Sequence, residues 1–386
     1  MKAVMKKRLH KLKKLRPKKT SAPVDAPVYV GDIDVTTLPK PTISKILYDA
    51  SEIVECVMTA EDLAVFKPNA LLSNASGGAG QKLWLNIHGV HDVDLIKQIG
   101  AIFKLHPLVI EDILNTEQRP KVDEFDDYIF LETRNFYYDK ETMSASSEQI
   151  SLVLGHNFLL TFQERATGAF EPIRERLRAS RAQIRELGVD YLAYCVLDSI
   201  VDRYFNVLED VGEDSEELEN LLLTKPSINE LHSIHQLKHV SIELRRAVWP
   251  LREVLNSLIR NEKGFFKPAT MPYLRDVYDH TVNFIESLES IRDTLSSMMD
   301  IYMASMSQRV NLELRALTVV TMLFMPATLI TGVFGMNFDY MPWLKHENGF
   351  YWALGLMFSI ATMMLLIFWR RQWVSRSVFS TDHSNK

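Results

Sequence analysis

The sequence is poor in cysteine, with Cys56 and Cys195 as its two thiols in 386 residues. Two cysteines cannot form the disulfide framework of a small secreted domain, so we expect both to be reduced and packed among apolar neighbours. The basic start of the chain also lacks the apolar core of a signal peptide, and we expect no cleaved leader. The formal net charge of −5 gives no indication of nucleic-acid binding.

Motifs for catalysis are missing as well. The glycine-rich stretch 74–82 does not fit a phosphate-binding loop, because Gln81 follows Gly80 and neither Ser nor Thr follows Lys82. We expect this stretch to be a flexible connection only. Because we also find no nucleophile–base motif and no convincing catalytic metal signature, we expect a protein that is not an enzyme.

Two segments near the C-terminal end contain no charged residue, 316–333 and 350–369. At about 1.5 Å per helical residue, each is long enough to cross a hydrocarbon core of about 30 Å. A buried helix of this length in a soluble protein normally keeps a charge on a solvated face. The sequence therefore predicts two membrane spans.

Positive charges predict how these spans are oriented. Loop 338–349 between the spans has a single Lys or Arg, whereas the outer flanks are richer in arginine. Because basic residues are retained on the cytoplasmic side, we expect a multi-pass protein of the cell inner membrane with both termini in the cytoplasm. The flanking arginines are Arg309, Arg315, Arg370, Arg371 and Arg376.

Upstream of the spans, apolar residues change their period along the chain. Segments rich in Val, Ile, Phe and Tyr predict strands, with helical segments between them. The predicted strands are 26–37, 82–90, 128–139 and 149–164, and the helices between them are 92–104 and 107–116. Farther on, 189–223 and 229–260 have apolar residues at spacings of three and four and predict an antiparallel helical hairpin.

The helical pattern that begins at Pro272 has no Gly or Pro before Pro326, so it continues into the first span. A helix of about 60 residues would be about 90 Å long and could not bury its apolar stripe alone. We therefore expect it to pack against copies of itself.

These patterns predict the following order of parts. They are a basic tail (1–25), an α/β domain (26–167), a helical hairpin region (168–270), a stalk helix (271–315), a first span with its motif (316–337), an external loop (338–349), a second span (350–369) and a basic tail (370–386).

Between the two spans lies the triplet Gly335-Met336-Asn337, with Tyr-Met-Pro at 340–342. This arrangement resembles the signature of the CorA family of magnesium channels and transporters. Blocks 106–130, 235–258, 272–281 and 324–342 also resemble blocks of that family, in the same order, so the resemblance covers roughly residues 26–376. It implies an α+β membrane protein that assembles as a funnel-shaped homopentamer, in which the stalk helix continues into a pore-lining first span and the second span faces lipid.

The resemblance further implies that Gly335, Met336 and Asn337 form a selectivity filter. Mg²⁺ prefers octahedral oxygen coordination and gives up its water reluctantly. A ring of neutral Asn337 amides, one from each subunit, could hydrogen-bond to the hydration shell of the ion without holding it too tightly. The same residues can also be interpreted as a glycine C-cap followed by an asparagine in a turn.

Residues that precede the triplet on the same helix are implied to line the pore. Polar rings are expected at Thr328, Asn311 and Asp300, and hydrophobic constrictions at Met325, Leu317 and Leu314. The apolar residues are equally compatible with contacts to lipid or to other helices.

Four acids match the regulatory positions of the family, namely Asp112 with Asp276 at one site, and Glu111 with Asp198 at a second. Carboxylates that face each other across a subunit interface repel unless a cation joins them. Bound cytosolic Mg²⁺ would then hold the assembly closed. Each acid can also be interpreted as an ordinary solvated carboxylate.

Two further groups of residues have open interpretations. His232, His235 and His239 recur at three and four residues and could bind Zn²⁺, or could form a solvated or packed helix face. Asp339 and Glu347 could concentrate cations outside the membrane, or could simply be solvated.

The expected function is Mg²⁺ influx down its electrochemical gradient, with negative feedback from cytosolic Mg²⁺ and with Co²⁺ as a possible second ion. One alternative is a Co²⁺, Ni²⁺ or Zn²⁺ transporter of the same family. Another is a membrane-tethered, metal-responsive scaffold that conducts nothing. The expected partners are other copies of the chain, membrane lipid and divalent cations, but no nucleic acid.

Overall fold

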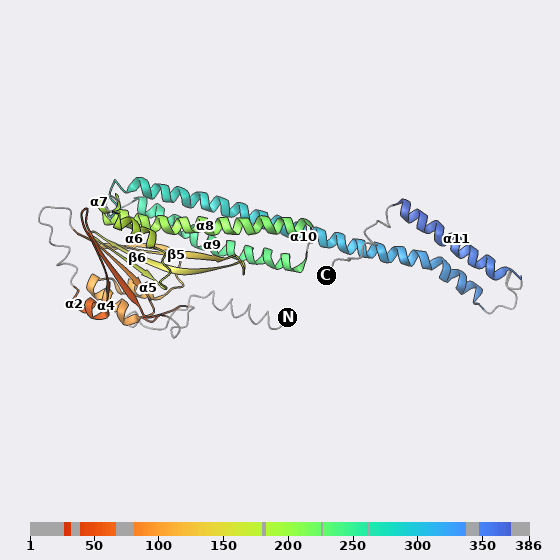
Figure 1. Cartoon of the computed structure of the whole chain (residues 1–386), viewed down its shortest axis with the longest axis horizontal. Helices are drawn as coiled ribbons and strands as arrows, with labels where there is room; N and C mark the ends of the chain where they lie inside the picture. The colour runs from red at the N-terminus through yellow and green to blue at the C-terminus, as the bar shows by residue number, and fades with distance from the viewer. Residues whose placement is uncertain are drawn as a thin grey trace. The chain divides into compact units, whose positions relative to one another are not determined.

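The computed structural model describes residues 27–31, 39–66, 81–179, 183–224, 227–260, 262–336 and 347–371, which are drawn as coloured ribbon in Figure 1. Several predictions fall outside these residues. They concern most of the glycine-rich stretch at 74–82, the basic tail 1–25, most of the basic tail 370–386, Asn337, Asp339 and most of the external loop.

A seven-stranded mixed sheet lies at the centre of the N-terminal part of the chain. Its strand order is β2-β1-β3-β7-β6-β5-β4, and β3 pairs with β7 in parallel whereas all other neighbours are antiparallel. Leu83 lies opposite Phe158 in the parallel pair, and Tyr128 lies opposite Gly155 in the β5–β6 hairpin. The strands are β1 (Thr42–Tyr48), β2 (Ile53–Met58), β3 (Lys82–His88), β4 (Lys121–Glu124), β5 (Tyr128–Asp139), β6 (Ser144–Gly155) and β7 (Phe158–Gln163).

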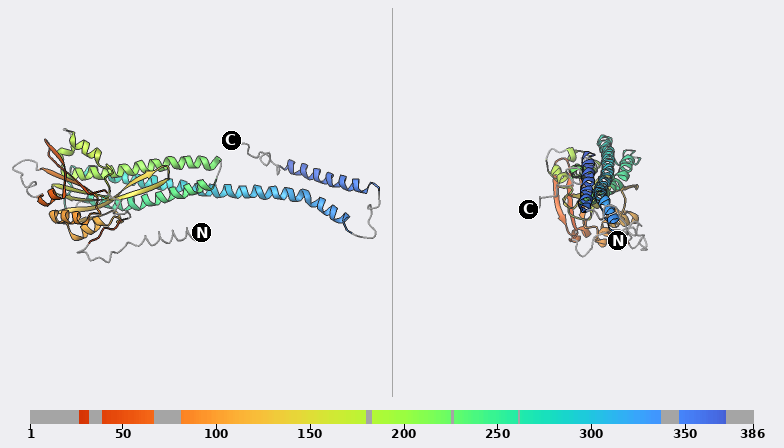
Figure 2. Two further views of the ribbon diagram at one scale, coloured as in Figure 1. Left: turned by 60° about the horizontal axis from the view of Figure 1, so that its bottom comes forward. Right: turned by 90° about the vertical axis from the view of Figure 1, so that its right-hand side faces the viewer.

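Helices cover both faces of this sheet. Figures 1 and 2 show α2, α4 and α5 on one face and α8 and α9 on the other. The helices are α2 (Ala60–Val65), α4 (Val93–Phe103), α5 (Pro107–Leu114), α6 (Glu171–Arg178), α7 (Gln183–Glu186), α8 (Val189–Thr224), α9 (Ile228–Arg260), α10 (Met271–Phe334) and α11 (Gly349–Arg370).

The main apolar core lies between the sheet and helices α4 and α5. Leu83, Leu85 and Phe130 from the sheet and Ile99 and Val109 from the helices are all buried within it. Burying a side chain of this size contributes about 1.5–3 kcal/mol. This core fixes α5, and therefore its acidic residues, against the sheet.

Helix α5 begins at a well-defined cap. His106 is the N-cap, and its Nδ1 accepts a hydrogen bond from the backbone N–H of Leu108 at 3.2 Å. Pro107 occupies the first turn, where a missing N–H costs nothing. The hydroxyl of Tyr128 accepts a hydrogen bond from the backbone N–H of His106 at 2.8 Å, which links the start of the helix to β5.

An aromatic cluster joins α8 to the sheet and to the first part of α10. The ring of Tyr204 on α8 lies 5.7 Å from Phe136 on β5 and 5.8 Å from Phe284 on α10. The Tyr204 hydroxyl also donates a hydrogen bond to the carbonyl of Arg134. The helical hairpin is therefore packed on the sheet and is not a separate domain.

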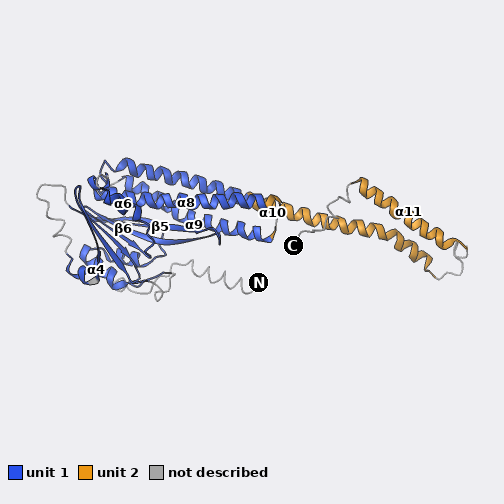
Figure 3. Ribbon diagram, viewed as in Figure 1, with its two compact units in different colours: residues 1–221, 228–296 blue, residues 222–227, 297–386 orange. Residues whose placement is uncertain are grey.

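The chain divides into two compact units, residues 1–221 with 228–296 and residues 222–227 with 297–386 (Figure 3). The second unit contains the end of α10 and all of α11. Among the described residues, these two helices are long and apolar enough to cross a membrane, with mean hydropathies of 1.9 and 2.0 over their most apolar stretches. Almost none of either stretch is buried, unlike the core helices of a soluble protein.

The predicted subunit fold is confirmed: an α/β domain, a helical hairpin and one long helix that continues into the first of two apolar helices. Two strand predictions need correction. Segment 149–164 is not one strand, because β6 and β7 form a hairpin around His156 and Asn157. Segment 26–37 is not a strand where it is described, since Val30 makes only an isolated bridge to Asn115.

Candidate functional site

The predicted pore-lining residues of α10 share one side of the helix. Asp300, Leu314 and Thr328 are each 14 residues apart, and Thr321, which was not predicted, lies midway between the last two and extends the series at seven-residue spacing. A seven-residue period keeps side chains on one face when helices wind around each other in a left-handed bundle. The remaining predicted residues lie three positions from a member of this series: Asn311, Leu317 and Met325.

The apolar members of this face are exposed in a single chain. Leu314, Leu317 and Met325 have 55%, 63% and 62% of their surface accessible. An open groove runs along the same side of the helix past Thr321, Met325 and Thr328 and ends at Met336. Exposed apolar side chains at helical spacing indicate a surface that lipid or other helices cover.

The threonines of this segment satisfy their donors within the helix. The hydroxyl of Thr328 donates to the carbonyl of Phe324 at 2.9 Å, and that of Thr321 donates to Leu317 at 2.9 Å. Because each hydroxyl has one donor, its oxygen can then only accept further hydrogen bonds. Water molecules around a cation present their hydrogens outward, so this face offers them suitable partners.

At the end of α10, the first two residues of the triplet are described and Asn337 is not. The N–H of Gly335 still donates to Thr331 at 2.9 Å, and that of Met336 donates to Val333 at 3.2 Å. Gly335 does not have a left-handed backbone conformation. A Cβ at this position would lie 3.1 Å from the Thr331 carbonyl oxygen, a close contact that a larger residue could make only if this turn shifted slightly.

Pro326 lies inside α10, within the predicted first span. Proline has no N–H, so the carbonyl of Met322 loses its usual helical donor. A free carbonyl within a membrane is tolerated where other helices or water can satisfy it. This feature again favours an α10 that is surrounded by partners.

Asp112, on α5, is engaged by two neighbours from its own chain. Its Oδ2 lies 2.5 Å from the Nζ of Lys121 on β4, and its Oδ1 accepts a hydrogen bond from the side-chain amide of Gln118 at 3.0 Å. Burial raises the pKa of Asp112, and the Lys121 ammonium opposes that shift. Both carboxylate oxygens are hard donors of the kind Mg²⁺ prefers, but both already have a partner.

Glu132, which the sequence analysis missed, lies beside Asp112. Glu132 is only 1% exposed. The side-chain amide of Gln149 donates hydrogen bonds to both the Glu132 Oε1 and the backbone carbonyl of Asp112, each at 3.1 Å. Burial, followed by the charge of Asp112, raises the pKa of Glu132 to about 9. Glu132 is therefore neutral near pH 7. The sequence could have indicated that Glu132 is buried, because it lies in the apolar strand that includes Phe130 and Leu131.

Asp198 on α8 and Asp276 on α10 both lie near His280. The Nε2 of His280 lies 3.8 Å from the Asp276 Oδ1, and a positive charge on the His280 ring would lower the pKa of Asp198. Burial raises the pKa of Asp198, and the negative charge of Asp202 adds to this. The Asp276 side chain is 64% exposed and so is open to a partner from outside the chain.

Glu111 is half-buried next to Asp112 on α5, whereas Asp300, Asn311 and Glu347 are exposed. Within the described ranges, no group of three or more His, Cys, Asp or Glu side chains is arranged to hold a metal ion. This also applies to the histidines of α9, of which His239 contacts the carboxylate of Glu243 at 3.1 Å. The described part of a single chain therefore contains no complete protein ligand set.

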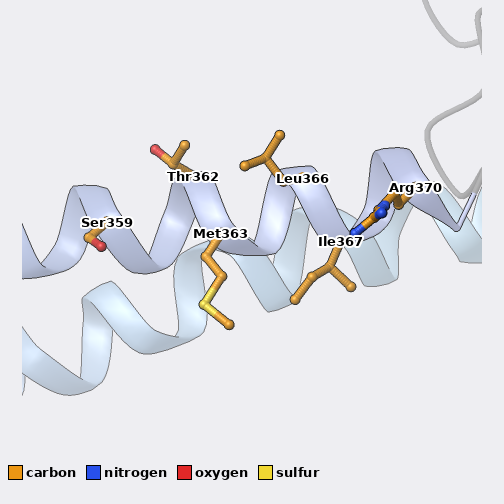
Figure 4. Close-up of a pocket in the computed structure, with 6 residues that line it drawn as sticks. All are labelled: Ser359, Thr362, Met363, Leu366, Ile367 and Arg370. Atoms are coloured by element: carbon orange, nitrogen blue, oxygen red, sulfur yellow. The ribbon is translucent and has the colours of Figure 1, made fainter.

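Helix α11 has an open groove of its own, shown in Figure 4. The hydroxyl of Thr362 donates to the carbonyl of Phe358 at 2.8 Å, so the helix satisfies this polar group internally. The rest of the groove is mainly aliphatic and offers no chemistry of its own. Its lining residues are Ser359, Thr362, Met363, Leu366, Ile367 and Arg370.

Curated proteins and solved structures are similar to this chain. The cobalt/magnesium transport protein CorA of Thermotoga maritima is 43% identical over 291 residues, which cover 75% of this chain and 83% of that protein. The protein of the same name from Methanocaldococcus jannaschii is 24% identical over 325 residues, covering 83% and 100%.

The complete structure of the M. jannaschii CorA magnesium transporter matches the fold with a TM-score of 0.71 at 22% identity, covering 86% of this chain and 98% of that one. The full-length CmaX protein matches with a TM-score of 0.66 at 18% identity, covering 89% and 100%. The family model described as CorA-like Mg²⁺ transporter protein matches residues 80–372. The chain therefore belongs to the family of CorA-like Mg²⁺ transporter proteins.

Proposed function

We propose that this protein transports Mg²⁺ into the cell across the inner membrane, with Co²⁺ as a second possible cargo. The observation that carries this proposal is the family match over residues 80–372, which includes both apolar helices and the triplet between them. The T. maritima relative is named a cobalt/magnesium transport protein. Both termini of the chain would lie in the cytoplasm.

Transport requires several copies of the chain. One α10 helix cannot enclose a path for an ion, and its seven-residue face is exposed. We propose a homopentamer in which five α10 helices place this face around a central pore, while α11 contacts lipid. Thr328, Asn311 and Asp300 would then form polar rings, and Met325, Leu317 and Leu314 would form constrictions that exclude water.

The proposed filter consists of Gly335, Met336 and a ring of Asn337 amides. Neutral carbonyl oxygens can hydrogen-bond to the water around Mg²⁺ and do not have to strip it. The membrane potential supplies about 2.3 kcal/mol per charge per 100 mV, and a divalent ion gains twice that. No nucleotide is needed for such a driving force.

The proposed feedback uses the four acids. Asp112 of one subunit would share a divalent ion with Asp276 of the next, and Glu111 with Asp198 would form the neighbouring site. The openness of Asp276 and the absence of a complete ligand set in the described part of one chain favour sites that two subunits share. Loss of Mg²⁺ would let the subunits separate and the pore open.

Mg²⁺ uptake into proteoliposomes that contain a Mg²⁺-sensitive dye tests the proposal. We expect uptake by the parent protein, loss of uptake in Asn337→Ala, and near-parent uptake in Asn348→Ala, a control at the start of α11. Equal uptake by the parent and Asn337→Ala would remove the filter assignment. Uptake of Co²⁺, Ni²⁺ or Zn²⁺ without Mg²⁺ would favour the alternative transporter, and no uptake of any ion would favour a non-conducting scaffold.

A further inference from the structure

The structure points to a role for Lys121 that rests on the proposed regulation by Mg²⁺. We infer that Lys121 is a built-in competitor for the Asp112 carboxylate, and that it sets the Mg²⁺ concentration at which the sensor responds. In this interpretation a divalent ion binds Asp112 only by displacing an ammonium group of the same chain.

The contacts of Lys121 place its ammonium where a cation would bind. The Nζ atom lies 2.5 Å from the Asp112 Oδ2 and 3.3 Å from the Asp123 Oδ2. It also lies 5.7 Å from the centre of the Phe130 ring. Two carboxylates and the face of an aromatic ring favour a positive charge at this point.

The backbone keeps Lys121 in this position. Lys121 is the first residue of β4, and it pairs with Glu132 in the register of the β4–β5 ladder. Its side chain is 34% exposed and that of Asp112 is 16% exposed, so the pair is only partly screened by solvent. Because the ammonium belongs to the same chain, its effective concentration at the carboxylate is high.

Lys121 engages one oxygen of the Asp112 carboxylate. Gln118 engages the other carboxylate oxygen. By contrast, Asp276 is exposed. One half of the proposed ion site is therefore open and the other half is occupied by the chain itself.

Competition between the Lys121 ammonium and Mg²⁺ for Asp112 would change the measured affinity for Mg²⁺. If the ammonium must leave before Mg²⁺ binds, the apparent affinity for Mg²⁺ is lower than the intrinsic affinity of the carboxylates. Removal of the ammonium should increase Mg²⁺ affinity, although it also removes a favourable contact. Loss of an ordinary structural ion pair would instead weaken the site or leave it unchanged.

The test measures Mg²⁺ binding by calorimetry, and the Mg²⁺-dependent rise in Tm, on the full-length protein for four variants. We expect Lys121→Met to shift the midpoint to a Mg²⁺ concentration lower by about threefold to tenfold, as befits a partly exposed ion pair. Lys121→Arg should remain near the parent, because it keeps the charge. Lys140→Met is the matched control, because Lys140 pairs with Asp210 and Glu213 elsewhere on the surface.

The fourth variant, Asp112→Asn, separates the two proposals. If Asp112→Asn weakens Mg²⁺ binding but Lys121→Met does not tighten it, the competitor role is wrong and the sensor stands. If Asp112→Asn leaves the Mg²⁺ response unchanged, the sensor proposal itself fails. A lower midpoint in Lys121→Met, together with a higher one in Asp112→Asn, supports both.

Discussion

At the scale of single residues, two carboxyl groups near α5, those of Asp112 and Glu132, have different surroundings. Asp112 keeps a cation from its own chain as a partner, whereas Glu132 has none and is held neutral by burial. Burial raises the pKa of both carboxyl groups, but at Asp112 the contacting Lys121 ammonium opposes the shift. Glu132 also lies deeper in the protein than Asp112, because its side chain is almost fully buried.

The raised pKa of Glu132 predicts a pH dependence of stability. Its folded-state pKa of about 9 exceeds the ordinary value of 4.5, so the folded protein binds more protons between these values. Its contribution to stability is complete below the ordinary pKa and declines as the pH rises through about 9. Glu132→Gln keeps the shape and removes the titration, so we expect its Tm to fall less than that of the parent over this range.

Thermal unfolding of the full-length protein at a series of pH values checks this prediction. Glu141→Gln is the control, since Glu141 is exposed in the turn between β5 and β6. A variant with the same slope as the parent across the whole range would show that Glu132 is ionised in the folded protein.

At the scale of elements, aromatic packing holds α8 and α10 together. Phe284 is fully buried, and its ring lies 5.8 Å from Tyr204 and 5.6 Å from Phe205. The acids Asp198 and Asp276 lie on these same two helices, so the packing positions one acid of each proposed regulatory site. The helix contact therefore matters for both stability and regulation.

Phe284→Ala should remove most of this packing. Phenylalanine-to-alanine changes in cores cost about 3–5 kcal/mol, so we expect a clear decrease in Tm. Met303→Ala on the same helix is the control, because Met303 is 61% exposed. Thermal unfolding of the two variants in the same detergent makes the comparison, and equal Tm values would contradict the packing described here.

The elements differ in how well the sequence predicted them. Helices α8, α9 and α10 were predicted within a few residues, because long amphipathic or apolar periods leave little choice. β1, β2 and β4 were missed, because charged residues such as Lys45, Glu55 and Asp123 interrupt their apolar pattern. The hairpin between β6 and β7 has only a short turn, so the two strands were interpreted as one.

The candidate site was predictable only in part. The spacing of the pore-lining residues on α10 could be predicted, because it depends only on residues close together in the sequence. The triplet indicated the family. The pairing of Asp112 with Lys121 depends on β4, which the sequence did not reveal. The burial of Glu132 depends on the sheet and on α5 together, and no local pattern encodes it.

At the scale of the whole molecule, the apolar face of α10 would act within the proposed assembly of several copies. If five copies of Leu314 form a constriction that excludes water, a polar side chain there should admit water and keep the pore conductive. We expect Leu314→Asn to take up Mg²⁺ severalfold faster than the parent when internal Mg²⁺ is high. Leu312→Asn, in the same turn but outside the seven-residue series, should behave like the parent.

Dye-loaded proteoliposomes with high internal Mg²⁺ allow this comparison. Similar rates for Leu314→Asn and the parent would show that Leu314 does not form the constriction. Faster uptake by both variants would indicate a general loosening of the helix instead.

Uptake of Mg²⁺ into proteoliposomes under an imposed membrane potential tests the proposed function most directly. A potential that is negative inside should accelerate uptake by the parent, because a divalent ion gains about 4.6 kcal/mol per 100 mV. Asn337→Ala should abolish that uptake. Mg²⁺ entry no faster than into protein-free liposomes, at any potential, would contradict transport by this protein.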